Sequence, residues 1–316
     1  MKDSIFQRSC ATGAAVKRGQ AIEEKSGPDA ARFSSLKLIN KQKGRDGMHP
    51  EPFHLLTNGI LKLQMNSKAA AAGFTTRVNG AGKPPYESRN TAFHVGENRN
   101  VTINNRMITA EHIGRPLSTW TAEEQVHGSR IVEVGRSDAG KGSEQRETSV
   151  AEADGMITDS KEVTLVSFYA DCVPLFFYAE NTAVAGLAHA GWKGTAADIG
   201  AEMIRAFAEK GVPPEQIYAA IGPAISGANY EVDEAVLSAL KQQHDFSSGE
   251  PWAQKANGRY ALDLKTANRL LLEQAGVLPE RIAVSDYCTY AKEDLFFSHR
   301  RENGKTGRMM SYIYII

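Results

Sequence analysis

Three side chains that can bind a soft metal ion or take part in nucleophilic catalysis stand at the ends of predicted strands. Cys172 lies between two apolar runs, His189 ends a third run, and His127 ends a strand-like segment and precedes a glycine. Short apolar runs rich in β-branched and aromatic residues are typical of buried strands, and groups at strand ends are held rigidly yet open to a cleft. Two imidazoles and one thiolate suit Zn²⁺, and three protein ligands leave a fourth position open, as in a catalytic site.

The same side chains also fit other chemistry. Cys172 can act as a nucleophile, with His189 or His127 as its base and Asp171 or Asp154 orienting that base. Asp171 can equally hold the tautomer of a histidine that binds a metal. A purely structural alternative is a buried cysteine with two hydrogen-bonded histidines. Two His and one Cys also form the core of a blue-copper site. A multicopper oxidase needs paired H-x-H ligands, however, and the chain has eight histidines and no H-x-H.

The segment after His189 reads GWKGT at 191–195 and predicts an anion site. A glycine-containing loop leads into a helix that is expected to begin at Thr195, and a helix N-terminus offers free N–H groups to an anion. Lys193 adds a full positive charge. The alternative is an ordinary turn between strand and helix with a solvated lysine.

The elements expected to position these groups alternate without a strict βαβ rhythm. We therefore expect an α+β or mixed α/β fold, and the Rossmann and P-loop glycine patterns are absent. Helix 102–113 is expected to have Thr102 as its N-cap and Ile103, Met107 and Ile108 on its buried face. Asp263 is expected to cap a helix that ends at Gly276. The other expected helices are 195–210 and 232–242, and the expected strands are 59–65, 73–77, 118–126, 131–134, 163–169, 173–178, 182–188, 216–221, 281–284 and 311–316.

Composition narrows the class of protein. The 316 residues carry 37 basic and 37 acidic side chains, and this balance argues against a general nucleic-acid or membrane-surface binder. Three cysteines exclude a disulfide framework and favour a reducing cytoplasm. Residues 1–47, which contain Cys10, have scattered charges and no sustained period, so we expect a poorly ordered tail with Met48 as a possible true start. Residues 48–316 are expected to form a single catalytic domain.

Several motifs in that region give the chain a family resemblance. It resembles the purine nucleoside phosphorylase family once called multicopper polyphenol oxidoreductase or laccase-domain proteins. Asn229 stands where the family often has a cysteine, and His299 stands where a tyrosine is common. The motifs are QVHG (125–128), ADCVP (170–174), HAGWKGT (189–195), IGP (221–223), YEV (230–232), FSHRR (297–301) and TGR (306–308).

The resemblance implies a zinc site made of His127, Cys172 and His189, in a four-layer α-β-β-α fold with two mixed sheets. It implies phosphorolysis of adenosine, inosine, guanosine and methylthioadenosine, together with deamination of adenosine. Purine nucleoside and phosphate would be the partners, in a monomer or small homo-oligomer. Arg77 matches an arginine that the family has near the site, so we expect Arg77, Lys193 and Thr195 to hold phosphate.

Other functions remain open at this point. Some family members are linked to the editing of peptidoglycan precursors, which would suit a cysteine-nucleophile hydrolase or amidase. A copper-dependent phenol oxidase and a non-catalytic binding protein are further alternatives.

Overall fold

The structure, a computed structural model, describes residues 50–65 and 69–316. The predicted tail, Cys10 and Met48 lie outside the described residues. Within them, one sheet has six strands in the order β1-β2-β3-β15-β7-β4. Its strands pair antiparallel except for β4 and β7, which run parallel. These strands are β1 (Phe53–Leu55), β2 (Ile60–Leu63), β3 (Ala70–Thr75), β4 (Trp120–Ala122), β7 (Thr164–Tyr169) and β15 (Met309–Ile315).

A second mixed sheet of the described chain carries the segments that hold Cys172 and His189. Its order is β14-β10-β8-β9-β6-β5, so the central pair β8 and β9 has neighbours on both sides. The strands are β5 (Ile131–Glu133), β6 (Gly155–Thr158), β8 (Val173–Ala179), β9 (Val184–Ala190), β10 (Tyr218–Ile221) and β14 (Ile282–Val284). A small third sheet contains β11 (Glu231–Val232), β12 (Trp252–Gln254) and β13 (Tyr260–Leu262).

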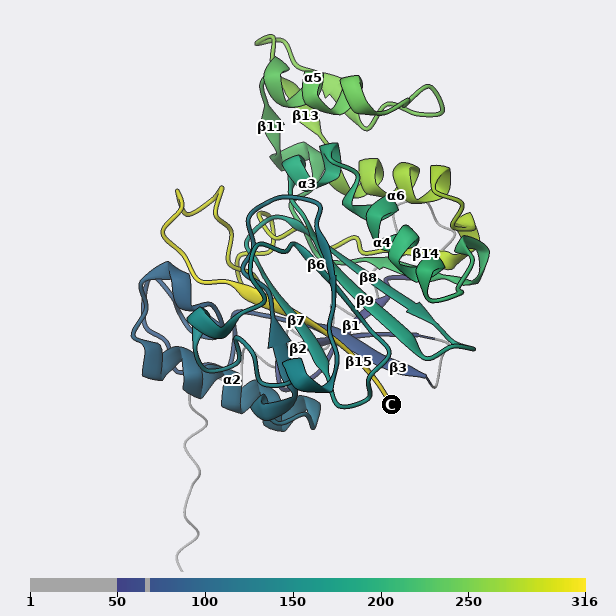
Figure 1. Cartoon of the computed structure of the whole chain (residues 1–316). Coiled ribbons are helices and arrows are strands. Elements are labelled where there is room, and N and C mark those ends of the chain that lie inside the picture. Colours follow the sequence, from purple (N-terminus) through teal and green to yellow (C-terminus); the bar gives the residue numbers. More distant parts are fainter. Residues whose placement is uncertain (1–49, 66–68) are drawn as a thin grey trace, which may run out of the picture. The chain divides into compact units, whose positions relative to one another are not determined.

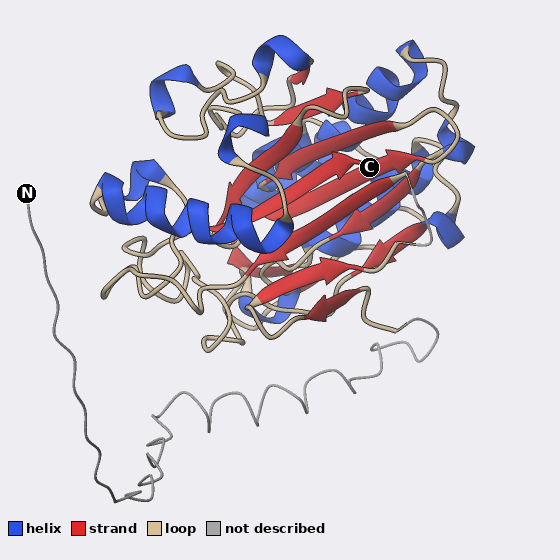
Figure 2. Cartoon of the chain, turned by 90° about the horizontal axis from the view of Figure 1, so that it is seen from below, coloured by secondary structure: helices blue, strands red, loops and turns tan. Residues whose placement is uncertain are grey.

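The two large sheets face each other, with β7 and β15 in contact with β9. Helix α2 (Arg99–Ile113) covers the outer face of the first sheet, and α4 (Ile199–Glu209) and α6 (Leu264–Gln274) cover the second sheet on the opposite side (Figure 1). Seen from below, the strands lie between the two groups of helices (Figure 2). The expected α-β-β-α arrangement with two mixed sheets is confirmed. The remaining helices are α3 (Trp192–Ala196) and α5 (Glu234–Gln243), and short 3₁₀ turns lie at Phe93–Val95, Leu117–Thr119, Arg136–Asp138, Arg146–Thr148, Pro214–Gln216, Gly227–Asn229 and Pro279–Arg281.

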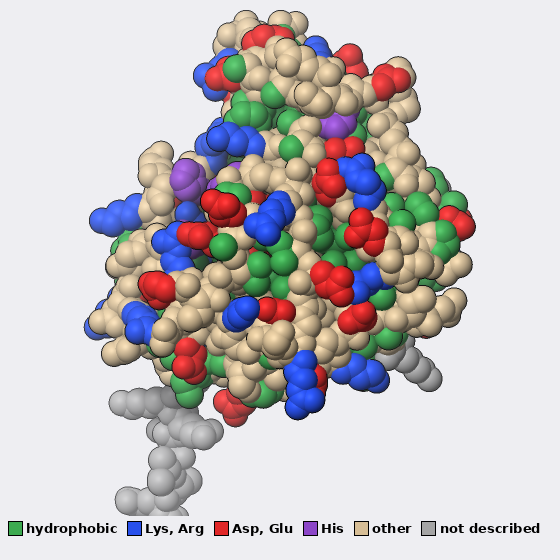
Figure 3. Space-filling view, viewed as in Figure 1, with side chains coloured by type: hydrophobic (Ala, Val, Ile, Leu, Met, Phe, Trp, Pro, Cys, Tyr) green, Lys and Arg blue, Asp and Glu red, His purple; other side chains and the backbone are tan. Residues whose placement is uncertain are grey.

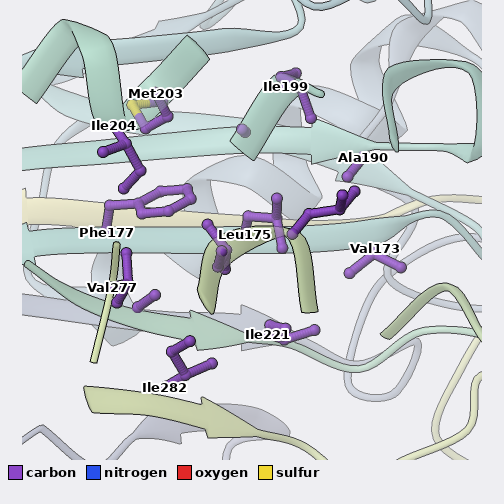
Figure 4. Close-up of a cluster of buried hydrophobic side chains, with 14 of the residues drawn as sticks. Val173, Leu175, Phe177, Ala190, Ile199, Met203, Ile204, Ile221, Val277 and Ile282 are labelled. Carbon is purple, nitrogen blue, oxygen red and sulfur yellow. The ribbon is translucent and has the colours of Figure 1, made fainter. Parts of the chain in front are cut away.

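The hydrophobic core that anchors the second sheet lies between its strands and α4. Met203 of α4 and Phe177 of β8 are fully buried in this core (Figure 4). Phe207 of α4 is also fully buried, with its ring centre 6.3 Å from that of Phe177. Burying a side chain of this size stabilises the fold by about 1.5–3 kcal/mol. The ends of β8 and β9 are therefore held by a rigid layer.

Two helix predictions were wrong. The buried face of α2 consists of Thr102, Asn105, Arg106, Thr109 and Ala110, while Met107 is exposed, and the N-cap is Asn98. This face packs on a polar network, so apolar periodicity did not identify it.

The helix predicted over 195–210 is two helices. Asp198 has a left-handed φ of 55°, which ends α3, and its side chain accepts a hydrogen bond from the backbone N–H of Ala201 and caps α4. Asp263 caps α6 as predicted.

Charged side chains of both signs are intermixed on the face shown in Figure 3, in line with the zero net charge. Among the residues that the structure describes, no helix has the length and apolar character needed to cross a bilayer.

Candidate functional site

Strand pairing brings two of the three candidate ligands to one edge of the second sheet. Strands β8 and β9 are antiparallel with Val173 opposite Ala190, so Cys172, just before β8, lies beside the end of β9 that carries His189. His127 lies in the loop between β4 and β5 with a left-handed φ of 62°. One donor atom from each of the three side chains lies within 4.8 Å of the others.

Asp154 organises this cluster. It directly precedes β6, which pairs with β9, and its buried carboxylate accepts a hydrogen bond of 2.9 Å from Nδ1 of His189. The same carboxylate accepts from the backbone N–H groups of Val126, His127 and Gly128 at 3.1, 3.0 and 2.6 Å. Three successive N–H groups converging on one anion form a nest that fixes the loop. One side chain therefore sets both the position of His127 and the orientation of His189.

The electrostatics of the cluster favour a thiolate. Burial raises the pKa of Cys172, but the positive charge of His189 and hydrogen bonds from His127 and His189 outweigh it and lower that pKa well below its ordinary value. Burial also raises the pKa of Asp154, yet the hydrogen bond with His189 and those from backbone N–H groups lower it overall. A thiolate and an ionised carboxylate thus flank His189, as a metal ligand set or a nucleophile with its base would require.

Gly191 has no side chain, and this leaves room for the side chains of Cys172 and His127. A Cβ atom at this position would lie 3.1 Å from Sγ of Cys172 and 3.3 Å from Cδ2 of His127. The glycine of the HAGWKGT motif is therefore explained by the close approach of these two side chains.

Asp171, which was predicted to be catalytic, lines the cavity and accepts several hydrogen bonds. Its buried carboxylate accepts hydrogen bonds from the hydroxyls of Thr289 (2.6 Å) and Ser298 (2.9 Å) and from the backbone N–H of Arg300 (2.8 Å). It therefore ties the loop of the FSHRR motif to the start of β8. Of the two aspartates considered as orienters, only Asp154 bonds to a histidine of the cluster.

A cavity of about 690 Å³ opens onto the cluster. This volume lies within the usual range for small-molecule sites. The aromatic side chains Phe168, Trp192 and Tyr230 line it, and so does His299 from the FSHRR motif. An aromatic lining beside ionisable groups suits a planar, polar ligand.

Glu123, at the end of β4, lines the same cavity and was missed in the sequence. It is 4% exposed, and one carboxylate oxygen accepts from the hydroxyl of Ser167 while Oε2 has no protein partner. Burial raises its pKa to about 7, although the bond from Ser167 lowers it. The predicted strand 118–126 ran past Glu123, whereas β4 ends at Ala122, so the sequence did not place Glu123 at a strand end.

The three side chains predicted to hold phosphate do not line the cavity. The Arg77 guanidinium donates to Oε1 of Glu302 at 3.0 Å and stacks over a phenylalanine ring. Lys193 is exposed beside Trp192, and buried Thr195 accepts a hydrogen bond from Asn268. Helix α3, at whose start Lys193 lies, has only five residues. Other cations line the cavity instead, among them Arg106 and Arg308.

The Asp154→Asn variant is expected to bind zinc about 10- to 100-fold more weakly than the wild type, because a ligand then loses its charged hydrogen-bond partner. A chelator competition titration would measure this affinity. Asp159→Asn is the matched control, since Asp159 lies at the other end of β6, is exposed and pairs with Lys210 at 2.8 Å. Equal zinc affinity of the Asp154→Asn and wild-type proteins would contradict the role given to Asp154.

Comparison with known proteins adds independent information. Residues 71–316 match the family described as multi-copper polyphenol oxidoreductase laccase. The Bacillus subtilis (strain 168) protein named purine nucleoside phosphorylase YlmD is 43% identical over 269 residues, which cover 83% of this chain and 96% of the relative. The Geobacillus stearothermophilus protein of the same name is 45% identical over 245 residues, covering 77% of this chain and 89% of the relative.

Solved structures agree with the fold. The crystal structure of YlmD from Geobacillus stearothermophilus superposes with a TM-score of 0.83 and 43% identity, covering 84% of this chain and 99% of that chain. The Bacillus licheniformis hypothetical protein YfiH gives a TM-score of 0.82 at 38% identity, with the same coverage.

Proposed function

The chain belongs to the family described as multi-copper polyphenol oxidoreductase laccase, and from this premise we propose that it is a zinc-dependent purine nucleoside phosphorylase that also deaminates adenosine. The names of its relatives support a purine nucleoside phosphorylase. The observation that carries the proposal is the His127, Cys172 and His189 cluster on a cavity of about 690 Å³. The proposed substrates are adenosine, inosine, guanosine and methylthioadenosine, with phosphate as co-substrate and the cytoplasm as location.

The donor set fits zinc. Tetrahedral zinc takes thiolate sulfur at about 2.3 Å and imidazole nitrogen at about 2.0–2.1 Å, so donors within 4.8 Å of one another need only a small contraction. A multicopper enzyme needs several metal positions, whereas in the described part of the chain these three side chains form the only cluster of at least three His, Cys, Asp or Glu residues suited to a metal. When bound, zinc would supply Lewis acidity at its fourth position, towards water or a polar substrate atom.

The other residues of the site would bind substrate and move protons. Asp154 holds Nδ1 of His189, which leaves Nε2 of that ring for the cluster. Phe168, Trp192 and Tyr230 offer aromatic faces for a purine ring. In deamination a proton must pass from water to the departing ammonia, and in phosphorolysis the departing purine must gain one. We assign this proton transfer to Glu123, which lines the cavity and has one buried carboxylate oxygen without a partner among the described residues.

A cysteine-nucleophile hydrolase or amidase acting on peptidoglycan precursors is the second candidate. The observation that favours it is the hydrogen-bonded series of Cys172, His189 and Asp154, which matches nucleophile, base and orienting group.

Metal analysis combined with chromatography of purine products tests the proposal. We expect about one zinc per chain, adenine released from adenosine only when phosphate is present, and inosine formed without phosphate. Protein without metal that forms no purine product would overturn the proposal. Peptide-bearing sugar nucleotides would then test the hydrolase.

A further inference from the structure

Arg106 is a buried cation that forms no ion pair with any residue that the structure describes. It projects from α2, is 1% exposed, and its guanidinium lies 4.0 Å from the centre of the Phe93 ring and 4.6 Å from that of Phe168. Nε and Nη1 donate to three backbone carbonyls at 2.6–2.7 Å, while no protein acceptor within the described ranges is assigned to Nη2. Carbonyl groups orient a guanidinium but leave its net charge uncompensated, and such burial costs free energy unless an anion is nearby.

Arg308 of the TGR motif, to which the proposed chemistry gives no role, is half-buried and also donates to backbone carbonyls. Its Nη1 donates to the backbone carbonyls of Thr306 and Gly307 at 2.9 and 3.0 Å. Across residues 50–65 and 69–316, Nε and Nη2 of Arg308 have no acceptor, and no carboxylate lies within 4.0 Å of either Arg106 or Arg308. Both guanidinium groups line the cavity with donors to spare.

The other arginines of the cavity are satisfied differently. Arg146 is exposed and pairs with Glu124 at 3.5 Å. Arg300 donates to the carbonyl of Glu231 at 2.9 Å and lies over the Tyr230 ring. Within the described residues, Arg106 is buried, Arg308 is half-buried, and neither of these two cavity arginines has an acidic partner.

Arg308 also lies within electrostatic reach of the metal-ligand cluster. Burial lowers the pKa of Arg308, while the negative charges of Cys172 and Asp171 raise it. An anion held by Arg308 would thus lie in the same cavity as a nucleoside at the cluster. This is the placement that attack on the sugar requires, because reacting groups must be held together in one orientation.

We propose that Arg106 and Arg308 form the binding site for the phosphate co-substrate, in place of Arg77, Lys193 and Thr195. This inference rests on the proposed phosphorylase function. Guanidinium groups present paired N–H donors that match two phosphate oxygens. A phosphate oxygen forms the new bond to C1′ of the ribose, the bond from C1′ to N9 breaks, and the purine leaves with that electron pair and gains a proton.

The test compares wild-type, Arg308→Ala and Arg308→Lys proteins in inosine phosphorolysis at varied phosphate. Losing charge-assisted hydrogen bonds should raise the phosphate KM of Arg308→Ala about 10- to 100-fold, with a smaller rise for Arg308→Lys, which keeps the charge. The inosine KM and the zinc content should stay close to wild type, and unchanged zinc shows that the variant is folded. Arg269→Ala is the matched control, because Arg269 is exposed on α6 outside the cavity lining and pairs with Glu273 at 2.8 Å. An exposed ion pair contributes about 0–1 kcal/mol, so its loss should alter the phosphate KM less than about fivefold.

Calorimetric titration with inorganic phosphate alone separates the two proposals. Phosphate binding that is lost in Arg308→Ala supports the site even if the wild type forms no phosphorolysis product, a result that would overturn only the proposed function. Equal phosphate binding and equal phosphate KM in a zinc-loaded Arg308→Ala protein would overturn the site.

Discussion

The Cys172→Ala protein is expected to purify almost without zinc and to lose phosphorolysis by more than about 100-fold, since removing a ligand should cost more than the 10- to 100-fold effect of losing a ligand's hydrogen-bond partner. Cys172 supplies the negative charge among the three donors, because a cysteine binds a metal as its thiolate. His127 and His189 alone would leave two neutral ligands, which hold zinc weakly.

Metal content and product formation would be measured on the same preparations. Cys288→Ala is the matched control: Cys288 is the other cysteine of the described chain, is buried, and accepts a hydrogen bond from the N–H of Ser226 at 3.3 Å. That variant should keep its zinc. A Cys172→Ala protein with normal zinc and normal turnover would contradict the assignment of the cluster.

Removing the metal from the wild-type protein with a chelator shows whether Cys172 acts as a metal ligand or as a nucleophile. If Cys172 is a ligand, removing the metal abolishes activity and adding zinc restores it. If Cys172 is a nucleophile, the chelated wild type stays active and a covalent substrate adduct on Cys172 is detected by mass spectrometry.

His127, Cys172 and His189 were predicted to lie together because each stands at the end of a predicted strand. Apolar runs in the sequence mark such strand ends well. The run before Cys172 corresponds to β7 and the run up to His189 to β9, and these two strands lie in different sheets. The antiparallel pairing of β8 with β9, which brings Cys172 beside His189, was not part of the prediction. The pairing of β6 with β9 is a long-range contact that no local pattern encodes. For this reason the sequence left Asp154 and Asp171 as equal alternatives, and the sheet register distinguishes them.

Buried charge is the feature that sequence patterns conceal. Arg106 stands on α2 where a charged residue normally faces solvent, and its burial results from contacts with loop carbonyls and two aromatic rings. Conversely, Lys193 looked like an anion ligand because it starts a helix after a glycine, but its side chain is exposed beside Trp192. Local charge marked Lys193 as a cation but could not show that its side chain lies outside the lining of the cavity.

The Glu123→Gln variant is expected to lose about 10²- to 10⁴-fold in turnover, the usual contribution of a positioned proton donor or acceptor. With a pKa raised to about 7, Glu123 is about half protonated at neutral pH. As a proton donor it loses effect as pH rises above 7, so wild-type turnover should fall on that side. The Gln variant should lack this limb of the pH profile.

A stability measurement distinguishes this role from a structural one. Because the folded-state pKa of Glu123 lies above the ordinary 4.5, its contribution to stability is present below pH 4.5 and is lost as pH rises through about 7. Replacing it by neutral glutamine should then raise the free energy of unfolding at pH 8.5, by up to about 3 kcal/mol relative to the change at pH 4.5. A structural glutamate would instead destabilise the protein when replaced.

Glu162→Gln is the matched control, since Glu162 is exposed, pairs with Arg136 at 3.4 Å outside the cavity lining and should alter turnover by less than about fivefold. If the Glu123→Gln variant is more stable at high pH and has lost turnover, the buried carboxyl of Glu123 lowers stability but is required for the reaction. Normal turnover in Glu123→Gln would instead assign proton transfer to another group of the cavity, whatever the stability change.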